Sequence, residues 1–317
     1  MKERINLVLS GGGARGLAHI GVIREIESRG YDIASIVGTS IGALVGAMYV
    51  QGKLQEFAAF LEKQNQESIM RLMDFTLSGH GLIRGKRFFD ELQKIAPDRN
   101  IEDIPIPITI IASDLITGRE VAISSGSLYQ AVRASVAIPT IIKPIYKNGM
   151  ILVDGGVTNP FPLNHVICRH KDECTIGVNL YAIDNPKDAQ ANFQNERNTN
   201  KSLTSLWLHL AQLRDWKKNL VDSIFTDTGN DFNYAGTFRR MSELMNGKMA
   251  QQSARLYPPD ITINIPLNAA GLFDFHLSKE LNALGRFRAS RAIDRYEAYT
   301  STLSYKLRRS LNLWRKS

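Results

Sequence analysis

The chain has 317 residues, 44% of them hydrophobic, so it can bury a large core and is not disordered as a whole. Its formal net charge is +8 and its pI is near 9.4, which indicates a surface that attracts anions. The Lys and Arg residues are scattered until the last dozen residues, and no zinc-finger, bZIP or RNA-recognition pattern is present. Nucleic acid is therefore not an expected partner.

The two cysteines, Cys168 and Cys174, are too few for a disulfide framework and indicate a reducing compartment. With His165 and His170 they suggest a zinc pattern, but Cys168 falls in a helical stretch while Cys174 begins a strand, so we expect no metal site. No segment approaches the roughly 20 apolar residues of a membrane span, and the N-terminal apolar stretch is too short for a signal peptide. The sequence predicts a cytoplasmic protein, with peripheral membrane contact left open.

The first half of the chain alternates apolar strand patterns with helical patterns. Strands are predicted over 5–10, 34–38, 106–112, 119–123 and 150–153. Helices are predicted over 14–30, 41–50, 53–64, 86–95 and 127–136. Strands separated by helices indicate a mostly parallel sheet that is covered on both faces.

The second half begins with a strand pattern over 173–180 and a polar stretch over 184–202 that predicts a surface loop. Apolar residues then recur at helical spacing from 203 to 224. The stretch 259–267 predicts one more strand, and apolar residues at intervals of three or four from 293 to 314 predict a C-terminal helix.

A glycine-rich segment joins the first strand pattern to the first helix pattern. It reads G-G-G-A-R-G and comprises Gly11, Gly12, Gly13, Ala14, Arg15 and Gly16. Backbone N–H groups at such a turn converge at the positive end of the helix dipole, where they bind negative charge. The segment also fits the dinucleotide fingerprint, but that fingerprint needs an acidic residue at the end of the second strand. Here the nearest acid, Asp32, precedes that strand.

The segment after the second strand pattern fits a serine nucleophile. It reads G-T-S-I-G and comprises Gly38, Thr39, Ser40, Ile41 and Gly42. G-x-S-x-G is the pattern of a nucleophile elbow, in which a serine occupies a sharp turn between a strand and a helix. In the alternative interpretation, Ser40 only caps the helix over 41–50.

A nucleophilic serine needs an oxyanion site and a base. The main-chain N–H groups of Gly12, Gly13 and Ala14 are the expected oxyanion donors. The neighbouring Arg15 is expected either to fix this loop or to meet an anionic headgroup.

The base is less evident from the residues. Neither His209 nor His276 stands in a motif. Asp154 ends an apolar strand and precedes Gly155 and Gly156, where its carboxylate can reach the C-terminal edge of the sheet. The alternative is an aspartate that only opens a turn, as Asp-Gly often does.

Three motifs in fixed order, G-G-G-A-R-G, G-T-S-I-G and D-G-G, resemble those of the patatin-like phospholipases. Further segments are similar to bacterial members: HGLIRGKRF (80–88), SDLITGRE (113–120), RASVAIPTIIKPI (133–145) and NPFP (159–162). Residues 271–286 are similar to the C-terminal part of bacterial relatives of neuropathy target esterase. The resemblance is clear over 5–182 and thinner over 259–290.

The resemblance implies an α/β fold with a mostly parallel central sheet flanked by helices, related to the three-layer sandwich of the α/β hydrolases. It implies a catalytic domain over 5–182 and a polar loop with a helical insertion or cap over 183–258. A C-terminal strand and helices over 259–317 then complete the same domain.

The resemblance further implies a lipid acyl hydrolase, a phospholipase or lysophospholipase in kind, acting on a phospholipid or another acyl ester. In that family the matching residues make Ser40 the nucleophile, Asp154 its base and residues 11–16 the oxyanion loop, without metal or cofactor. D-G-G stands where many relatives have D-G-A. Two alternatives stay open: an acyltransferase or non-lipid esterase with the same dyad, and a regulatory lipid-binding module without turnover.

The last twelve residues hold five Lys or Arg and no acid, with Leu307, Leu311 and Trp314 on one helical side. A basic amphipathic segment of this kind can lie on an anionic membrane. It can equally pack on the body of the protein and expose its charges.

Overall fold

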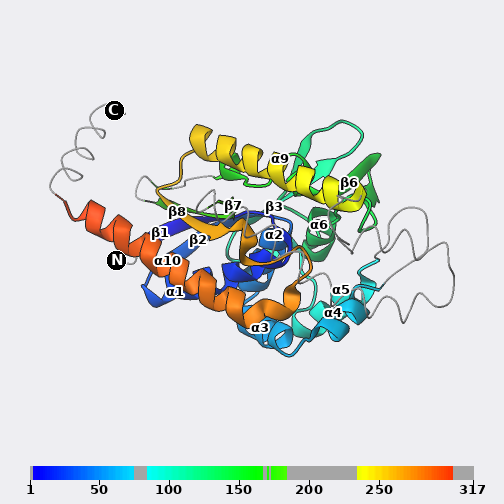
Figure 1. Cartoon of the computed structure of the whole chain (residues 1–317), viewed down its shortest axis with the longest axis horizontal. Helices are drawn as coiled ribbons and strands as arrows, with labels where there is room; N and C mark the ends of the chain where they lie inside the picture. The colour runs from blue at the N-terminus through cyan, green and yellow to red at the C-terminus, as the bar shows by residue number, and fades with distance from the viewer. Residues whose placement is uncertain (1–2, 75–83, 167–169, 171–172, 184–233, 303–317) are drawn as a thin grey trace.

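The computed structural model describes residues 3–74, 84–166, 170, 173–183 and 234–302. These residues build one eight-stranded sheet with helices around it (Figure 1). The strands are β1 (Arg4–Leu9), β2 (Asp32–Thr39), β3 (Ile108–Asp114), β4 (Glu120–Ile123), β5 (Ile145–Lys147), β6 (Met150–Asp154), β7 (Cys174–Ala182) and β8 (Ile261–Pro266).

The sheet is mixed, and its larger part is parallel. The strands run in the order β5-β6-β3-β2-β1-β7-β8, with β4 paired to β3. Strands β3, β2, β1, β7 and β8 are parallel to one another, whereas β4, β5 and β6 are antiparallel to their partners. The predicted α/β fold with a mostly parallel central sheet is confirmed.

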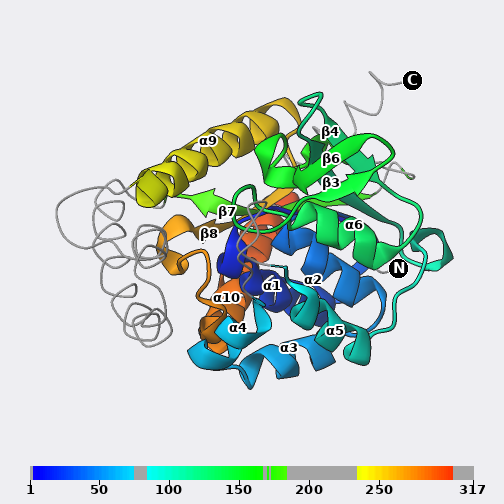
Figure 2. The same cartoon turned by 90° about the vertical axis from the view of Figure 1, so that its right-hand side faces the viewer.

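Helices cover both faces of this sheet. They are α1 (Ala18–Ser28), α2 (Ile41–Val50), α3 (Leu54–Glu62), α4 (Gln66–Leu72), α5 (Lys86–Ile95), α6 (Leu128–Ser135), α9 (Tyr234–Leu256) and α10 (Ser278–Thr300). Helices α1, α2 and α10 lie on one side of the sheet and α9 lies on the other (Figures 1 and 2). Among the described residues, no helix has both the length and the apolar content that crossing a bilayer requires.

Strand β1 contributes to two cores, because its side chains alternate between the faces of the sheet. Ile5, Leu7 and Leu9 pack in the large core with residues of α1, α2 and α10. Val8 packs in a smaller core on the other face, which includes Ala250 of α9. Burial on both faces explains why this strand reads as a nearly continuous apolar run.

The glycine-rich segment changes how the first helix begins. The helix predicted over 14–30 starts as a 3-10 turn, Gly13–Leu17, and becomes α-helical only at Ala18. Gly12 and Gly13 have φ values of 152° and 60°, which disfavour any side chain larger than hydrogen. The chain therefore bends into a loop between β1 and α1.

The C-terminal part of the chain joins the same sheet. Strand β8 pairs in parallel with β7, which confirms the strand predicted over 259–267. Helix α10 packs along α1 and covers β8. The helical pattern from 203 to 224 and the basic tail lie outside the described residues, and the division of the chain into three parts stays a prediction.

Helices α1 and α10 approach so closely that the contact requires glycine. A Cβ atom on Gly21 of α1 would lie 1.9 Å from the carbonyl oxygen of Asn282. A Cβ atom on Gly285 of α10 would lie 2.0 Å from the carbonyl oxygen of Ala18. Both oxygens belong to helix backbone, so a side chain at either glycine would push the helices apart.

Replacing Gly285 by Ala is expected to lower the free energy of unfolding by about 2 to 3 kcal/mol, because the two helices must separate. Gly247 of α9 provides the control, since a Cβ there meets nothing closer than the Tyr181 Cβ at 3.8 Å. Gly247→Ala should be neutral or stabilise by up to about 1 kcal/mol through helix propensity. Urea unfolding followed by circular dichroism measures both, and equal effects would contradict the packing argument.

Candidate active site

Ser40 and Asp154 are brought together by the way three strands share β3. Strand β4 pairs with residues 110–113 of β3 along one edge of that strand. Along the other edge, β2 pairs with β3 as far as Ile111, and β6 pairs with β3 from Ala112 onward. The C-terminal ends of β2 and β6 therefore meet head to head, and the residue after Thr39 lies beside Asp154.

Ser40 occupies the sharp turn between β2 and α2 that the nucleophile-elbow pattern predicts. Its backbone angles are φ 55° and ψ −123°, a conformation that costs a non-glycine residue about 1 to 3 kcal/mol. The Ser40 N–H donates to Ser135 Oγ at 2.8 Å, and Ser135 Oγ donates to the Ile111 carbonyl oxygen at 2.5 Å. Ser135 thereby ties the strained turn to strand β3.

The side chain of Ser40 donates to Asp154, with 2.6 Å between Oγ and Oδ2. The interpretation of Ser40 as only a helix cap is therefore wrong, because its hydroxyl is engaged with Asp154 rather than with α2. The other carboxylate oxygen of Asp154, Oδ1, accepts from the Gly156 N–H at 2.7 Å. Asp154 thus opens a turn and also contacts Ser40.

Both side chains lie almost out of solvent, each residue being 7% exposed. Burial raises the pKa of Asp154 from its ordinary value of 3.8 to about 6, although the Ser40 hydroxyl and the Gly156 N–H oppose this rise. A carboxylate with a pKa near 6 is a stronger base than an exposed aspartate and is still ionised at neutral pH. Asp154 can therefore accept the proton of the Ser40 hydroxyl.

The glycine-rich loop lies directly against Ser40. A Cβ atom on Gly11 would be 3.3 Å from the Ser40 Cβ. The Ala14 N–H, predicted as an oxyanion donor, is already engaged, because it donates to the Leu272 carbonyl oxygen at 2.9 Å. Among the hydrogen bonds between described residues, none uses the N–H of Gly12 or Gly13, so these two donors remain available for an anion.

Several predicted glycines are sites of close backbone approach. A Cβ on Gly16 would lie 2.2 Å from Ile41 Cγ2, so the loop and the serine turn pack directly on each other. A Cβ on Gly155 would lie 2.2 Å from the Ile111 carbonyl oxygen. At Gly42 and Gly38, a Cβ would come within 2.3 Å of the Leu9 oxygen and 2.7 Å of the Ala43 nitrogen, respectively.

Arg15 fixes the glycine-rich loop from inside the protein. It is 1% exposed, and its Nη1 donates to the carbonyl oxygens of Ala270 and Leu267 at 3.1 and 3.3 Å. The same nitrogen lies 3.4 Å from Glu243 Oε1 of α9. A guanidinium this deeply buried cannot meet a lipid headgroup. Of the two roles expected for Arg15, it therefore fixes the loop, and the expected contact with an anionic headgroup is wrong.

The other residues considered for the site lie elsewhere. His276 stands in the 3-10 turn Phe275–Leu277, while the hydroxyl of Ser40 is bonded to Asp154. His209 and Cys168 lie outside the described residues, and Cys174 is buried in β7. His19 is buried beside the first strand: its Nε2 lies 2.9 Å from the Ser10 carbonyl oxygen, and burial lowers its pKa to about 4.

Sequence reasoning missed the residues that hold the serine turn in place. Ser135 lies in the segment 133–145, which signalled the family resemblance without revealing a role. The Asn159 carbonyl oxygen accepts from Thr39 Oγ1 at 2.9 Å, and the next carbonyl, of Pro160, accepts from the Gly11 N–H at 2.9 Å. These contacts join positions more than 90 residues apart in the chain, so no local pattern marks them.

The sequence model of the patatin-like phospholipases matches residues 7–167. The chain belongs to the patatin-like phospholipase family. This membership supports lipid hydrolase activity in general and agrees with the order of the three motifs.

Relatives extend the match beyond the family model. An NTE family protein of Mycobacterium tuberculosis is 31% identical over 336 residues, covering 93% of this chain and 92% of the relative. Mouse patatin-like phospholipase domain-containing protein 6 is 29% identical over 218 residues, which span 67% of this chain and 15% of the mouse protein. Among solved structures, VipD of Legionella pneumophila matches with a TM-score of 0.47 and 14% identity, covering 93% of this chain and 67% of VipD.

The raised pKa of Asp154 predicts a pH-dependent stability. The protonated carboxyl contributes stability that is full below about pH 4 and is lost as pH rises through about 6, because the buried charge is then formed. Asp154→Asn cannot ionise, so at pH 8 it should be more stable than the wild type by about 2 to 3 kcal/mol. This difference should vanish below pH 4 in urea unfolding across the pH range.

The control for this prediction is Asp114 of β3, whose pKa is lowered, chiefly by the Thr117 hydroxyl. Asp114→Asn should therefore destabilise the protein at pH 8, the opposite sign. If Asp154→Asn also destabilised the protein at pH 8, the carboxylate would not be the unfavourable buried charge described above.

Ser135→Ala should lower the free energy of unfolding by about 2 to 3 kcal/mol, because the Ser40 N–H loses its partner in the interior and the Ile111 carbonyl oxygen loses one hydrogen bond. Ser127 caps the N-terminus of the same helix at the surface, accepting from the Gln130 N–H at 3.1 Å. Ser127→Ala should cost about 1 kcal/mol. A Ser135→Ala loss no larger than that of Ser127→Ala, measured by urea unfolding, would refute the tie between Ser135 and the serine turn.

Proposed function

We propose that the protein is a lipid acyl hydrolase in which Ser40 is the nucleophile and Asp154 is its base. The observation that carries this proposal is the 2.6 Å hydrogen bond from Ser40 Oγ to Asp154 Oδ2. The two residues lie 114 positions apart in the chain, yet strand pairing places them side by side. Family membership adds independent support for the chemistry of ester hydrolysis.

In the first half of the reaction, Ser40 Oγ bonds to the carbonyl carbon of the ester while its proton passes to Asp154. The N–H groups of Gly12 and Gly13 stabilise the negative charge on the carbonyl oxygen. When the tetrahedral intermediate collapses, the C–O bond to the leaving alcohol breaks, and that alcohol takes the proton from Asp154. An acyl group then remains on Ser40.

In the second half, Asp154 removes a proton from water, and the resulting hydroxide oxygen attacks the acyl group. Collapse of the second intermediate returns the proton to Ser40 and releases the fatty acid. Every proton in this route moves between Ser40, Asp154, the alcohol and water. The route therefore uses no cofactor.

The burial of Asp154 is central to this mechanism. An aspartate with an ordinary pKa of 3.8 would be a poor base toward a hydroxyl. Burial raises the pKa of Asp154 to about 6, which makes its carboxylate a stronger base and brings its pKa closer to that of the serine hydroxyl. The substrate adds to this effect, because an acyl chain beside the dyad excludes further water.

Two related functions use the same residues. An acyltransferase would pass the acyl group from Ser40 to an alcohol other than water, and a non-lipid esterase would act on short soluble esters. A regulatory lipid-binding module would bind the substrate without turnover. The intact Ser40–Asp154 contact favours an enzyme over such a module.

We also propose that the basic segment over 306–317 contacts anionic membrane peripherally. Its five Lys or Arg residues and absence of acids support attraction to anionic lipid. Phospholipid is the substrate that such contact would serve.

Ser40→Ala should abolish hydrolysis of nitrophenyl butyrate and labelling by a fluorophosphonate probe, because both need the hydroxyl. Asp154→Asn should lower kcat about a thousandfold with little change in KM, since it removes the general base without reshaping the site. His276→Ala is the control and should keep kcat within about twofold.

Loss of activity in His276→Ala, with Asp154→Asn nearly as active as the wild type, would overturn the assignment of the base. A folded wild-type protein that is not labelled and hydrolyses none of a panel of esters would favour the binding module. The panel contains lysophospholipids, diacyl-phospholipids and short-chain nitrophenyl esters. A preference for the short-chain esters would favour the non-lipid esterase.

A further inference from the structure

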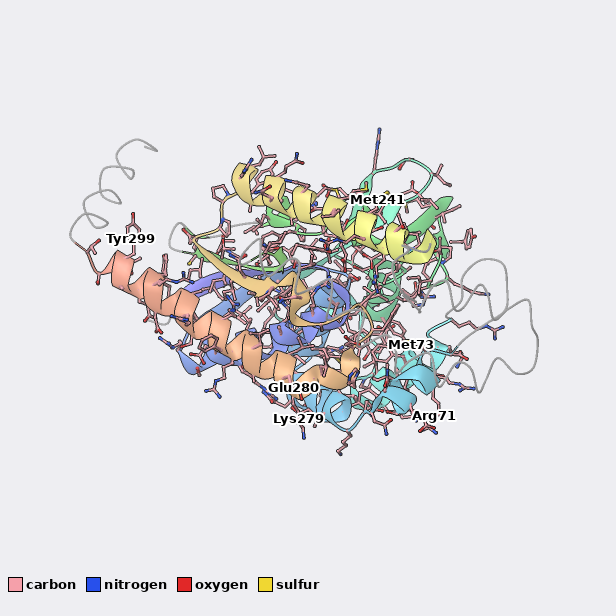
Figure 3. All side chains as sticks on the ribbon, in the orientation of Figure 1. Arg71, Met73, Met241, Lys279, Glu280 and Tyr299 are labelled. Atoms are coloured by element: carbon pink, nitrogen blue, oxygen red, sulfur yellow. The ribbon has the colours of Figure 1, made fainter. Side chains whose placement is uncertain are left out.

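Helix α9 has a buried face and an apolar outer face. Glu243 and Ala250 point inward and are buried. Met241, Leu244 and Met245 point outward, with exposures of 48%, 49% and 56%. Their spacing of three and four residues places them side by side on one stripe of the helix. Figure 3 shows Met241 on α9, across the molecule from Lys279 and Glu280 of α10.

The exposed charge along α9 is positive. Its basic residues are Arg239, Arg240, Lys248 and Arg255. Its one acidic residue, Glu243, is buried and lies 3.4 Å from Arg15. Lys248 and Arg255 are exposed on the C-terminal half of the helix, one to three turns beyond the apolar stripe. An apolar stripe continued by basic residues matches the chemistry of a helix that lies on an anionic lipid surface.

The inner face of α9 borders the dyad. The Asn246 Nδ2 atom lies 3.4 Å from the place of a Cβ on Gly156, whose N–H bonds to Asp154. The same Nδ2 donates to the Tyr181 hydroxyl at 3.4 Å. Burial raises the pKa of Tyr181, and the nearby charge of Asp154 adds to this rise. Helix α9 therefore lies beside the turn that follows Asp154 on this side of the sheet.

A further exposed apolar residue lies in the turn that follows Asp154. Val157, three residues after Asp154, is 44% exposed. It belongs to the short turn Gly155–Val157, which α9 approaches through Asn246. The turn that follows Asp154 thus carries one exposed apolar side chain of its own.

We propose that the outer face of α9, with Met241, Leu244 and Met245 at its centre, docks the protein on the surface of an anionic phospholipid bilayer. This inference rests on the proposed function, because a lipid acyl hydrolase must reach a substrate that is held in a membrane. Docking through α9 holds at the bilayer the helix whose inner face borders the turn after Asp154, and so keeps the protein on the surface that contains its lipid substrate. The positive outer charge of the helix selects anionic over zwitterionic lipid.

The test uses the full chain and vesicles of phosphatidylglycerol and phosphatidylcholine in equal parts. Replacing Met241, Leu244 and Met245 together by Gln keeps helix propensity and removes the apolar stripe. The partition coefficient in vesicle co-sedimentation should fall at least tenfold, because burying about 55 Å² of apolar surface already corresponds to a factor of ten. Raising NaCl from about 50 to about 500 mM should weaken wild-type binding through screening.

Phe287→Gln is the matched control. Phe287 is a similarly exposed apolar residue, at 54%, but it belongs to α10 on the other side of the sheet. This variant should bind vesicles within about twofold of the wild type. Hydrolysis of soluble nitrophenyl butyrate should be unchanged in the triple Gln variant, since none of the three side chains contacts the dyad.

Three results would overturn the inference: wild-type protein that does not bind these vesicles, a triple Gln variant that binds like wild type, or binding lost only on removal of 306–317. A triple variant that changes from dimer to monomer in analytical ultracentrifugation, with vesicle binding intact, would assign the stripe to a second copy of the chain. Failure of the proposed function has a separate signature, because wild-type protein would then hydrolyse no ester whether or not it bound lipid.

Discussion

The site depends on one feature of the sheet: β2 and β6 share the same edge of β3, end to end. Along this edge, the pairing partner of β3 changes between Ile111, which pairs with Thr39, and Ala112, which pairs with Asp154. A shift of one residue in the pairing of β6 with β3 would move Asp154 by about 3.3 Å and turn its side chain to the other face of the sheet. The contact between the Ser40 hydroxyl and Asp154 is therefore a consequence of strand register, and the loops only complete it.

The surrounding structure compensates for the free energy that this arrangement of the site costs. Ser40 has a positive φ, Asp154 holds a charge away from water, and two N–H groups in the glycine-rich loop have no hydrogen-bond partner among the residues that the structure describes. Each of these raises the free energy of the folded state. They are tolerated because β1 and β2 are packed on both faces and because Ser135 and Arg15 hold the adjoining backbone from within. Rigid strands and buried hydrogen bonds thus keep the site in a conformation that a flexible loop would abandon.

Features of the fold and the site that depend on a local pattern could be predicted from the sequence. Features that depend on strand register or on contacts between distant residues could not. The G-T-S-I-G turn, the strand that ends at Asp154 and the alternation of strands and helices all follow from residue type and spacing. The antiparallel pairing of β6 with β3 does not, because nothing in a five-residue strand specifies its partner or direction. The Arg15–Glu243 pair joins residues 228 positions apart, and the engagement of the Ala14 N–H depends on a carbonyl at Leu272, so neither leaves a local signal.

Helix α9 connects the interior of the site with the molecular surface. Its inner face supplies the carboxylate beside the buried guanidinium of Arg15, and loss of that carboxylate would leave an unpaired charge in the interior. Because successive residues of a helix are rotated by a fixed angle, the turn that points Glu243 inward also points Met241, Leu244 and Met245 outward. The element that steadies the glycine-rich loop therefore also fixes the direction of the apolar stripe. On the docking proposal, one rigid helix sets the orientation of the dyad relative to the bilayer, which a mobile segment could not do.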